Sequence, residues 1–156
     1  MSARRADRVA ALHRAFEHIA ATRMAGLPLV HPRLAVATVG FQGHDDEAAL
    51  GVLVTPWCMN LVRLPLHEGV GTLAVGETGS REVGTRCFDF IGAHEPGVGA
   101  FESASLFSPM AEFADQAAAR ATAEAVLKEL RGPLPPRVAQ PARRGFLFGR
   151  REGAAA

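Results

Sequence analysis

The sequence is poor in cysteine, with two in 156 residues, and it contains no long apolar run. Cys58 and Cys87 lie far apart and form no C-x-x-C pair, so we expect reduced thiols in a cytoplasmic protein rather than a disulfide framework. A transmembrane helix needs about 18 consecutive apolar residues, and a secretory signal needs an apolar segment near the start. Neither pattern is present, because charges recur throughout the first residues. The sequence therefore predicts a protein that is neither secreted nor embedded in a membrane.

The chain also lacks an excess of charge, because its formal net charge is +1. This balance is not typical of proteins that bind nucleic acid or membrane surfaces through overall charge. The charge is nevertheless uneven: residues 132–156 carry five arginines and one glutamate, a balance of +4, and the other 131 residues balance at −3. We expect a single α+β domain over residues 1–131 and a basic, Pro- and Arg-rich C-terminal tail over residues 132–156.

Helices are predicted at both ends of the folded part. Over residues 5–24, apolar side chains recur every three to four residues, which is typical of a helix with one buried stripe. A second helix is predicted up to Arg131, because the segment from Met110 is rich in Ala, Glu, Lys and Leu. Ser108 is its predicted N-cap, and Pro109 suits the first turn, where a missing N–H costs nothing.

Short β-branched segments fill the sequence between these helices, and breaks rich in glycine, proline or polar residues separate most of them. Most connections are too short for a crossover helix, which favours antiparallel pairing. We therefore predict an α+β fold in which an antiparallel, meandering sheet has one face covered by an N-terminal and a C-terminal helix. The predicted strands are residues 34–41, 49–55, 61–64, 71–75, 82–91 and 100–106.

Sequence signatures of catalysis and of cofactor binding are missing. The glycines form neither a P-loop nor a dinucleotide-binding fingerprint, and no G-x-S-x-G motif is present. His13 and His18 are five residues apart, so they do not share a helix face as two metal ligands would. Cys58 has no neighbouring basic cluster in the sequence that would activate it, which favours a structural thiol. We expect no catalytic residues, no cofactor and no metal site, and an active site assembled only by the fold stays an open alternative.

Two segments contain apolar side chains that packing in the hydrophobic core does not readily explain. The first contains the only tryptophan. Trp57 directly follows Pro56 at a break between predicted strands, where proline indicates an edge or a bulge. An exposed tryptophan close to Met59 would make a good anchor for a partner protein. Packing of Trp57 in the core between strands is the alternative.

The second such segment is an apolar triplet in the tail, formed by Phe146, Leu147 and Phe148. An apolar triplet within a polar, Pro-rich tail is typical of a docking peptide. The pair Arg143 and Arg144 before it suits an acidic partner surface, with binding that weakens as salt increases. Folding of the triplet back onto its own domain is the alternative.

Several motifs follow one another in an order that is specific in combination. They are residues 51–57 (Gly-Val-Leu-Val-Thr-Pro-Trp) with Met59, residues 75–77 (Val-Gly-Glu), residues 105–115 with their Leu-Phe-Ser-Pro-Met run, and the arginine pairs around residues 147–149. This combination resembles the HybE-type, HupJ-like [NiFe]-hydrogenase assembly chaperones over nearly the whole chain. Some family members carry a rubredoxin domain with paired C-x-x-C iron ligands, which are absent here, so the resemblance implies no bound iron.

The resemblance implies a cytoplasmic, non-enzymatic protein that binds a precursor of the small or the large hydrogenase subunit, or of both, during maturation and before twin-arginine export. Other maturation proteins are further candidate partners, and neither nucleic acid nor stable membrane insertion is expected. Residues 143–147 (Arg-Arg-Gly-Phe-Leu) look like the core of a twin-arginine motif, although at the C-terminus they cannot act as an export address. We hypothesise that they mimic the small-subunit signal peptide; coincidence in an Arg-rich tail is the alternative.

Three functions are therefore compared: a hydrogenase assembly chaperone, a generic protein-binding adaptor, and a small thiol or serine hydrolase. The ordered motifs and the missing catalytic set favour the chaperone. An adaptor would have the same tryptophan and tail without a preference for hydrogenase precursors, and a hydrolase would need Cys58 or a serine beside a histidine in a cleft. The predicted partner-binding residues are Thr55, Pro56, Trp57, Met59, Arg143, Arg144, Phe146, Leu147 and Phe148.

Overall fold

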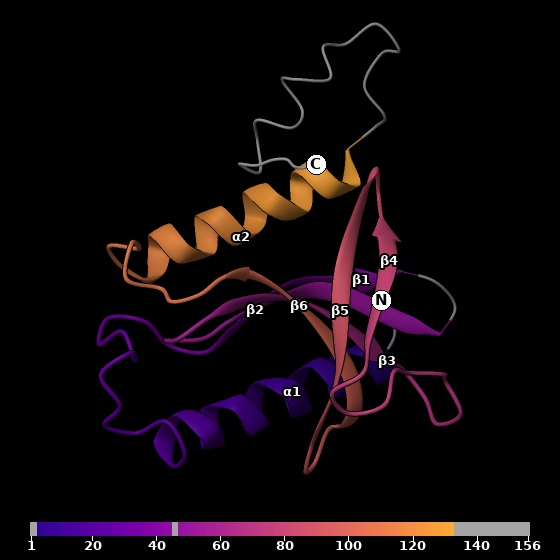
Figure 1. Cartoon of the computed structure of the whole chain (residues 1–156), viewed down its shortest axis with the longest axis horizontal. Coiled ribbons are helices and arrows are strands. Elements are labelled where there is room, and N and C mark those ends of the chain that lie inside the picture. Colours follow the sequence, from indigo (N-terminus) through magenta and orange to yellow (C-terminus); the bar gives the residue numbers. More distant parts are fainter. Residues whose placement is uncertain (1–2, 45–46, 133–156) are drawn as a thin grey trace, which may run out of the picture.

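A computed structural model describes residues 3–44 and 47–132. They form a six-stranded sheet with α2 above it and α1 below it in the view of Figure 1. Within these residues, neither helix has both the length and the apolar character that crossing a bilayer requires. In chain order the elements are α1 (Ala3–Ala21), β1 (Ala37–Gly43), β2 (Ala48–Val54), β3 (Met59–Pro65), β4 (Thr78–Val83), β5 (Arg86–Glu95), β6 (Gly99–Phe107) and α2 (Gln116–Arg131).

All neighbouring strands of the sheet are antiparallel, in the order β1-β2-β3-β6-β5-β4. The predicted α+β class, an antiparallel sheet packed with an N-terminal and a C-terminal helix, is confirmed. Each half of the sheet is a three-stranded meander, and the halves join where β3 pairs with β6. The meander does not run through the whole sheet, because the chain passes from β3 to β4 at the far edge before it returns to the middle.

Two of the predicted strands differ from the structure. Residues 71–75 form no strand, and only Val75 makes an isolated bridge, to Gly92. The predicted strand over residues 82–91 is interrupted by a turn at Gly84. It contains the end of β4 and the first part of β5, which together form a hairpin. Gly84 has a φ of +63°, and an added Cβ would lie 2.2 Å from the carbonyl oxygen of Leu130 in α2. A glycine is needed at this turn, both for its backbone conformation and for the close approach of α2.

The second helix begins six residues later than the predicted start at residue 110. Asp115 is its N-cap, and the Asp115 carboxylate accepts a hydrogen bond from the Ala118 N–H at 2.9 Å. The prediction of Ser108 as the cap is wrong, because tertiary contacts hold residues 108–115 in a non-helical connection. Met110 is completely buried, and the ring of Phe113 packs against the sheet side chain Phe107.

Burial of β2 explains why the two helices lie on opposite faces of the sheet. All seven residues of β2 are buried, so both faces of this strand need cover. Val52 belongs to the core cluster that contains the α2 side chains, and Leu53 belongs to the cluster that contains Leu12 of α1. The prediction that the helices cover one face is therefore wrong, since each face of the β1–β3 half carries one helix (Figure 1).

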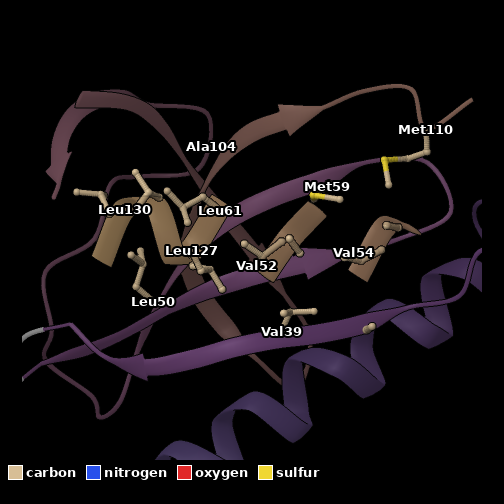
Figure 2. Close-up of a cluster of buried hydrophobic side chains, with 14 of the residues drawn as sticks. Val39, Leu50, Val52, Val54, Met59, Leu61, Ala104, Met110, Leu127 and Leu130 are labelled. Carbon is tan, nitrogen blue, oxygen red and sulfur yellow. The ribbon is translucent and has the colours of Figure 1, made fainter. Parts of the chain in front are cut away.

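The larger core lies between the sheet and α2. Figure 2 shows Val52 and Leu61 of the sheet near Leu127 and Leu130 of the helix. Ala119 and Ala123 are also fully buried, and their small side chains let α2 approach the strands closely. The other buried members of this cluster are Leu34, Ala37, Val39, Leu50, Val54, Met59, Val83, Phe90, Ala104 and Met110.

A buried carboxylate joins the two halves of the sheet. Glu102 of β6 has no exposed surface, and its two oxygens accept hydrogen bonds from Arg81 of β4 at 2.5 and 2.9 Å. The Leu73 N–H donates to the same carboxylate at 2.8 Å. Arg63 of β3 lies 3.7 Å from it and donates to the Gly71 carbonyl at 3.2 Å. The carboxylate therefore fixes the connection between β3 and β4 onto the sheet.

We expect Glu102→Ala to lower the free energy of unfolding by roughly 3–5 kcal/mol, because it leaves the buried Arg63 and the half-buried Arg81 without their common carboxylate. Glu82→Ala is the matched control, since Glu82 is exposed on β4, and it should stay within about 0.5 kcal/mol of the parent protein. Urea denaturation followed by circular dichroism measures both values. A loss below about 1 kcal/mol for Glu102→Ala would show that the cluster contributes little to stability.

Candidate protein-docking site

The segment predicted to anchor a partner forms the tight connection between β2 and β3. The Thr55 N–H donates to the Cys58 carbonyl at 2.8 Å and closes the turn. The Thr55 hydroxyl oxygen accepts hydrogen bonds from the N–H groups of Trp57 at 3.2 Å and of Cys58 at 2.9 Å. Pro56 has no N–H to satisfy, so the buried Thr55 hydroxyl, together with this main-chain bond, is enough to hold the turn. This side chain fixes the backbone that presents Trp57.

The loop between α1 and β1 lies beside this turn. The His31 N–H donates to the Pro56 carbonyl at 2.8 Å. Nδ1 of the His31 ring accepts from the Arg33 N–H at 3.0 Å, and Nε2 lies 2.6 Å from the Phe113 carbonyl oxygen. A neutral ring with its hydrogen on Nε2 satisfies both contacts. One side chain therefore links the loop after α1 to the connection before α2.

The connection between β6 and α2 completes this end of the molecule. Phe107 lies opposite Met59 in the β3–β6 register, and its ring meets the ring of Phe113 edge-on, with the centroids 5.3 Å apart. At the start of α2, the Gln116 amide accepts from the Ala35 N–H at 2.9 Å and donates to the Ala35 carbonyl at 3.1 Å. Two segments that carry the family resemblance, around Trp57 and around Phe107, are thus neighbours in the fold.

We call this region the turn-end surface; it consists of residues 22–35, 55–58 and 106–115, at the left in Figure 1. Leu27 and Leu29 are 41% and 49% exposed, although both are large and apolar. Trp57 is half-buried, and among the described residues the side chains packed in the two core clusters do not include it. The core does not account for these side chains, and exposed apolar groups of this kind are typical of protein-docking sites.

The structure separates the predicted partner-binding residues into two groups. Thr55, Pro56 and Met59 have buried side chains, so they support the turn, and Trp57 alone of these four presents side-chain surface to solvent. Trp57 thus lies between the two alternatives of a fully exposed anchor and a core residue. The predicted tail residues lie outside the described residues: Arg143, Arg144, Phe146, Leu147 and Phe148.

Sequence reasoning missed the contribution of the loop after α1. The helix prediction over residues 5–24 assigns no role to the residues that follow, although Leu27 and Leu29 form an apolar run in a loop. That run was the available signal. His31 carried no signal, because its role depends on backbone groups that are distant in the sequence, such as the carbonyl of Phe113.

Both cysteines are free, with Cys58 half-buried and Cys87 exposed. Burial raises the pKa of the Cys58 thiol, and the hydrogen bond to the Thr55 hydroxyl at 3.3 Å partly opposes this shift. A raised pKa lowers the fraction of thiolate at neutral pH, whereas a nucleophilic cysteine needs more thiolate. In the described part of the chain, no three His, Cys, Asp or Glu side chains are grouped so that they could hold a metal ion.

Comparison with known proteins connects this architecture to hydrogenase assembly. A family model described as "[NiFe]-hydrogenase assembly, chaperone, HybE" matches residues 7–149. The chain is 49% identical to HoxT of Cupriavidus necator over 93% of this chain and 90% of HoxT. It is 42% identical to the hydrogenase expression/formation protein HupT of Azotobacter chroococcum over 90% of this chain and 94% of HupT.

A solved structure with the same fold is the solution structure of HybE from Escherichia coli. The two structures superpose with a TM-score of 0.64 at 27% sequence identity, over 94% of this chain and 91% of HybE. The family model covers most of the chain, and the relatives align over nearly their full lengths. The chain therefore belongs to the HybE family of [NiFe]-hydrogenase assembly chaperones.

Proposed function

We propose that this chaperone binds the precursor of a [NiFe]-hydrogenase subunit in the cytoplasm during maturation, before twin-arginine export. The turn-end surface is the proposed docking site. The observation that carries this proposal is the position of Trp57, which is half-buried outside both core clusters and lies where two motifs of the family resemblance meet. The names of the relatives, which include a hydrogenase expression/formation protein, support a hydrogenase subunit as the client.

The rigidity of the turn-end surface supports a role as a preformed docking site. The His31 backbone N–H and the Thr55 hydroxyl hold the backbone on the two sides of Trp57, at the Pro56 carbonyl and the Cys58 N–H, so little conformational freedom of the chaperone is lost on binding. Tryptophan combines a large apolar area with one hydrogen-bond donor, which suits it to anchor an interface. Leu27 and Leu29 are exposed on the loop that bonds to the turn through His31 and Pro56, so the matching client segment should itself be apolar and exposed before assembly.

Trp57→Ala should weaken client binding by about 2 kcal/mol, which is roughly 30-fold. The tagged protein is incubated with a cytoplasmic extract of a hydrogen-oxidising host that expresses the hydrogenase operon. Proteins that are retained in the affinity pull-down are identified by mass spectrometry. A tag at the N-terminus lies at the start of α1, at the opposite end of this helix from residues 22–35. Enrichment of unprocessed hydrogenase subunits is expected with the parent protein, and their absence would overturn the proposed client.

Val75→Ala is the matched control, because Val75 is 72% exposed but belongs to the connection before β4. It should bind the client as the parent protein does. Thermal unfolding tests the fold of Trp57→Ala, which should lose no more than about 2 kcal/mol, compared with roughly 3–5 kcal/mol for a buried aromatic side chain. Leu27→Ser with Leu29→Ser changes only exposed positions and should also weaken binding. Full binding by both variants would exclude the turn-end surface as the docking site.

The two thiols should differ in reactivity, which tests the hydrolase alternative. In the native protein at pH 7, iodoacetamide should modify the exposed Cys87 first and Cys58 far more slowly, because Cys58 is half-buried with a raised pKa. The Cys58 rate should rise as the pH increases beyond the range in which an ordinary thiol ionises. Mass spectrometry of the two peptides over time measures both rates. Fast modification of Cys58 at pH 7 would instead favour a thiol enzyme.

We further propose that the C-terminal tail competes with the client's signal peptide through its Arg-Arg-Gly-Phe-Leu sequence, residues 143–147. Deletion of residues 141–156 should then strengthen binding of a small-subunit precursor about threefold or more, an effect of about 0.7 kcal/mol. Arg143→Ala with Arg144→Ala should reproduce the effect, and a precursor without its signal peptide should show none. Isothermal titration measures the affinities, and a change within about 0.5 kcal/mol would exclude the tail from this recognition.

A further inference from the structure

The sheet has one open edge that lies between the two helices. β1 is the terminal strand of the sheet order, so among the described residues no strand neighbours one side of its backbone. Such an edge can accept a further extended segment as an added strand, which forms main-chain hydrogen bonds. We propose that the β1 edge is a second docking site, which takes an extended, acidic segment of a partner protein. This inference goes beyond the proposed function and does not depend on the turn-end surface.

A groove runs along each face of the β1 edge. The groove on the α1 side is lined by the half-buried Val9 and Phe41 and by the basic residues Arg5, His13 and Arg14. The groove on the α2 side is lined by the buried Val39 and Leu127, with charged residues around them. Each groove therefore combines apolar and charged side chains; on the α2 side the apolar ones are buried, and on the α1 side Val9, Phe41, Arg5 and His13 are all half-buried. The charged residues of the second groove are Arg120, Glu124, Lys128 and Arg131.

The charge of these grooves indicates the chemistry of the occupant. Within the described residues, no acidic residue lines the groove on the α1 side, although the Glu17 carboxylate lies 3.1 Å from the His13 ring, and Glu124 is the single acid against three basic residues on the α2 side. Successive side chains of an added strand point to opposite faces, so they would enter the two grooves alternately. The grooves thus fit a segment with acidic and apolar side chains on both of its faces.

Charge also argues against the two occupants that this chain itself could supply. A second copy paired through β1 would bring the same basic residues, such as Arg120 and Lys128, against each other. The C-terminal tail carries five arginines and one glutamate over residues 132–156, so it would also meet charges of its own sign. Like charges opposed across an interface select against such pairings. An acidic segment of another protein is the occupant that remains.

Side chains from the two ends of α2 set the length of the available edge. Gln116 pairs with both backbone groups of Ala35, as a neighbouring strand would. Arg131 donates to the carbonyl oxygens of Gly40 at 2.7 Å and Leu50 at 2.6 Å, where the register of β1 shifts. Residues 36–39 lie between these contacts; Val36, Ala37 and Val39 are buried there, and Thr38 is half-buried. A strand added over so short a stretch makes few main-chain bonds, so charge should contribute much of the affinity, and binding should weaken with salt.

The test uses the full chain and a labelled synthetic peptide, Val-Val-Glu-Glu-Val-Val-Glu-Glu-Val-Val, which places valine and glutamate on both faces of a strand. Fluorescence anisotropy at low salt should detect binding that is lost as salt increases. In the ¹⁵N-labelled protein, the amides of Ala37–Val39 should shift, and the indole signal of Trp57 should not. A peptide with lysine for glutamate should bind at least about tenfold more weakly. A peptide N-methylated at alternate residues should lose binding if main-chain bonds are made.

Charge-reversal variants test the location of the site. Arg120→Glu with Lys128→Glu should weaken peptide binding about tenfold or more. Arg4→Glu with Arg86→Glu makes the same change in net charge at two positions that line neither groove and lie outside the turn-end surface, and it should have little effect. Equal loss in both double variants would reveal non-specific attraction and overturn the proposal, as would unshifted β1 amides. Trp57→Ala should bind the peptide normally, so failure of this site and failure of the turn-end surface are distinguishable.

Discussion

Because β2 is buried on both faces, each face of the sheet needs its own helix, and the positions of the loops and of the sheet edges follow from that need. The β2 sequence, Ala-Ala-Leu-Gly-Val-Leu-Val, has no polar face to turn toward water, so a single helix layer would leave one face uncovered. The chain meets this need with α1 on one face and α2 on the other. Gly51 contributes by having no side chain, since an added Cβ would lie 2.4 Å from the ring of Phe41, which crosses β2 there.

The placement of the helices also creates both surfaces that we assign to partners. The chain leaves α1 and enters α2 at the same end of the sheet as the β2–β3 turn, so three connections meet there and frame Trp57. The contacts of His31 with Pro56 and Phe113 hold these connections together without contributing to either core cluster. The same arrangement leaves the β1 edge between two helices, with a basic groove on each side. The placement of one helix on each face thus both stabilises the sheet and leaves these two surfaces exposed.

Part of the fold and part of the site could be predicted from the sequence, because they depend on local patterns. The period of apolar residues predicted α1 to within three residues at either end, and the short connections predicted antiparallel pairing. The position of Trp57 after Pro56 indicated a special turn. The start of α2 could not be predicted in this way, because Ser108 and Asp115 are both good caps. Contacts of Met110 and Phe113 with the sheet decided between them.

Local residue patterns were sufficient to predict the α+β class, the two helices, most strands, the unusual Thr-Pro-Trp turn and the resemblance to hydrogenase assembly chaperones. These depend on residues that are close in the chain or on motif order. The tertiary structure alone decided the strand order, the face that each helix covers, the half-buried position of Trp57 and the grooves beside β1. The physical reason is that burial and charge at a surface arise from contacts between distant residues. Arg81 and Glu102, for example, are 21 residues apart in the sequence, so local periodicity cannot predict that they pair.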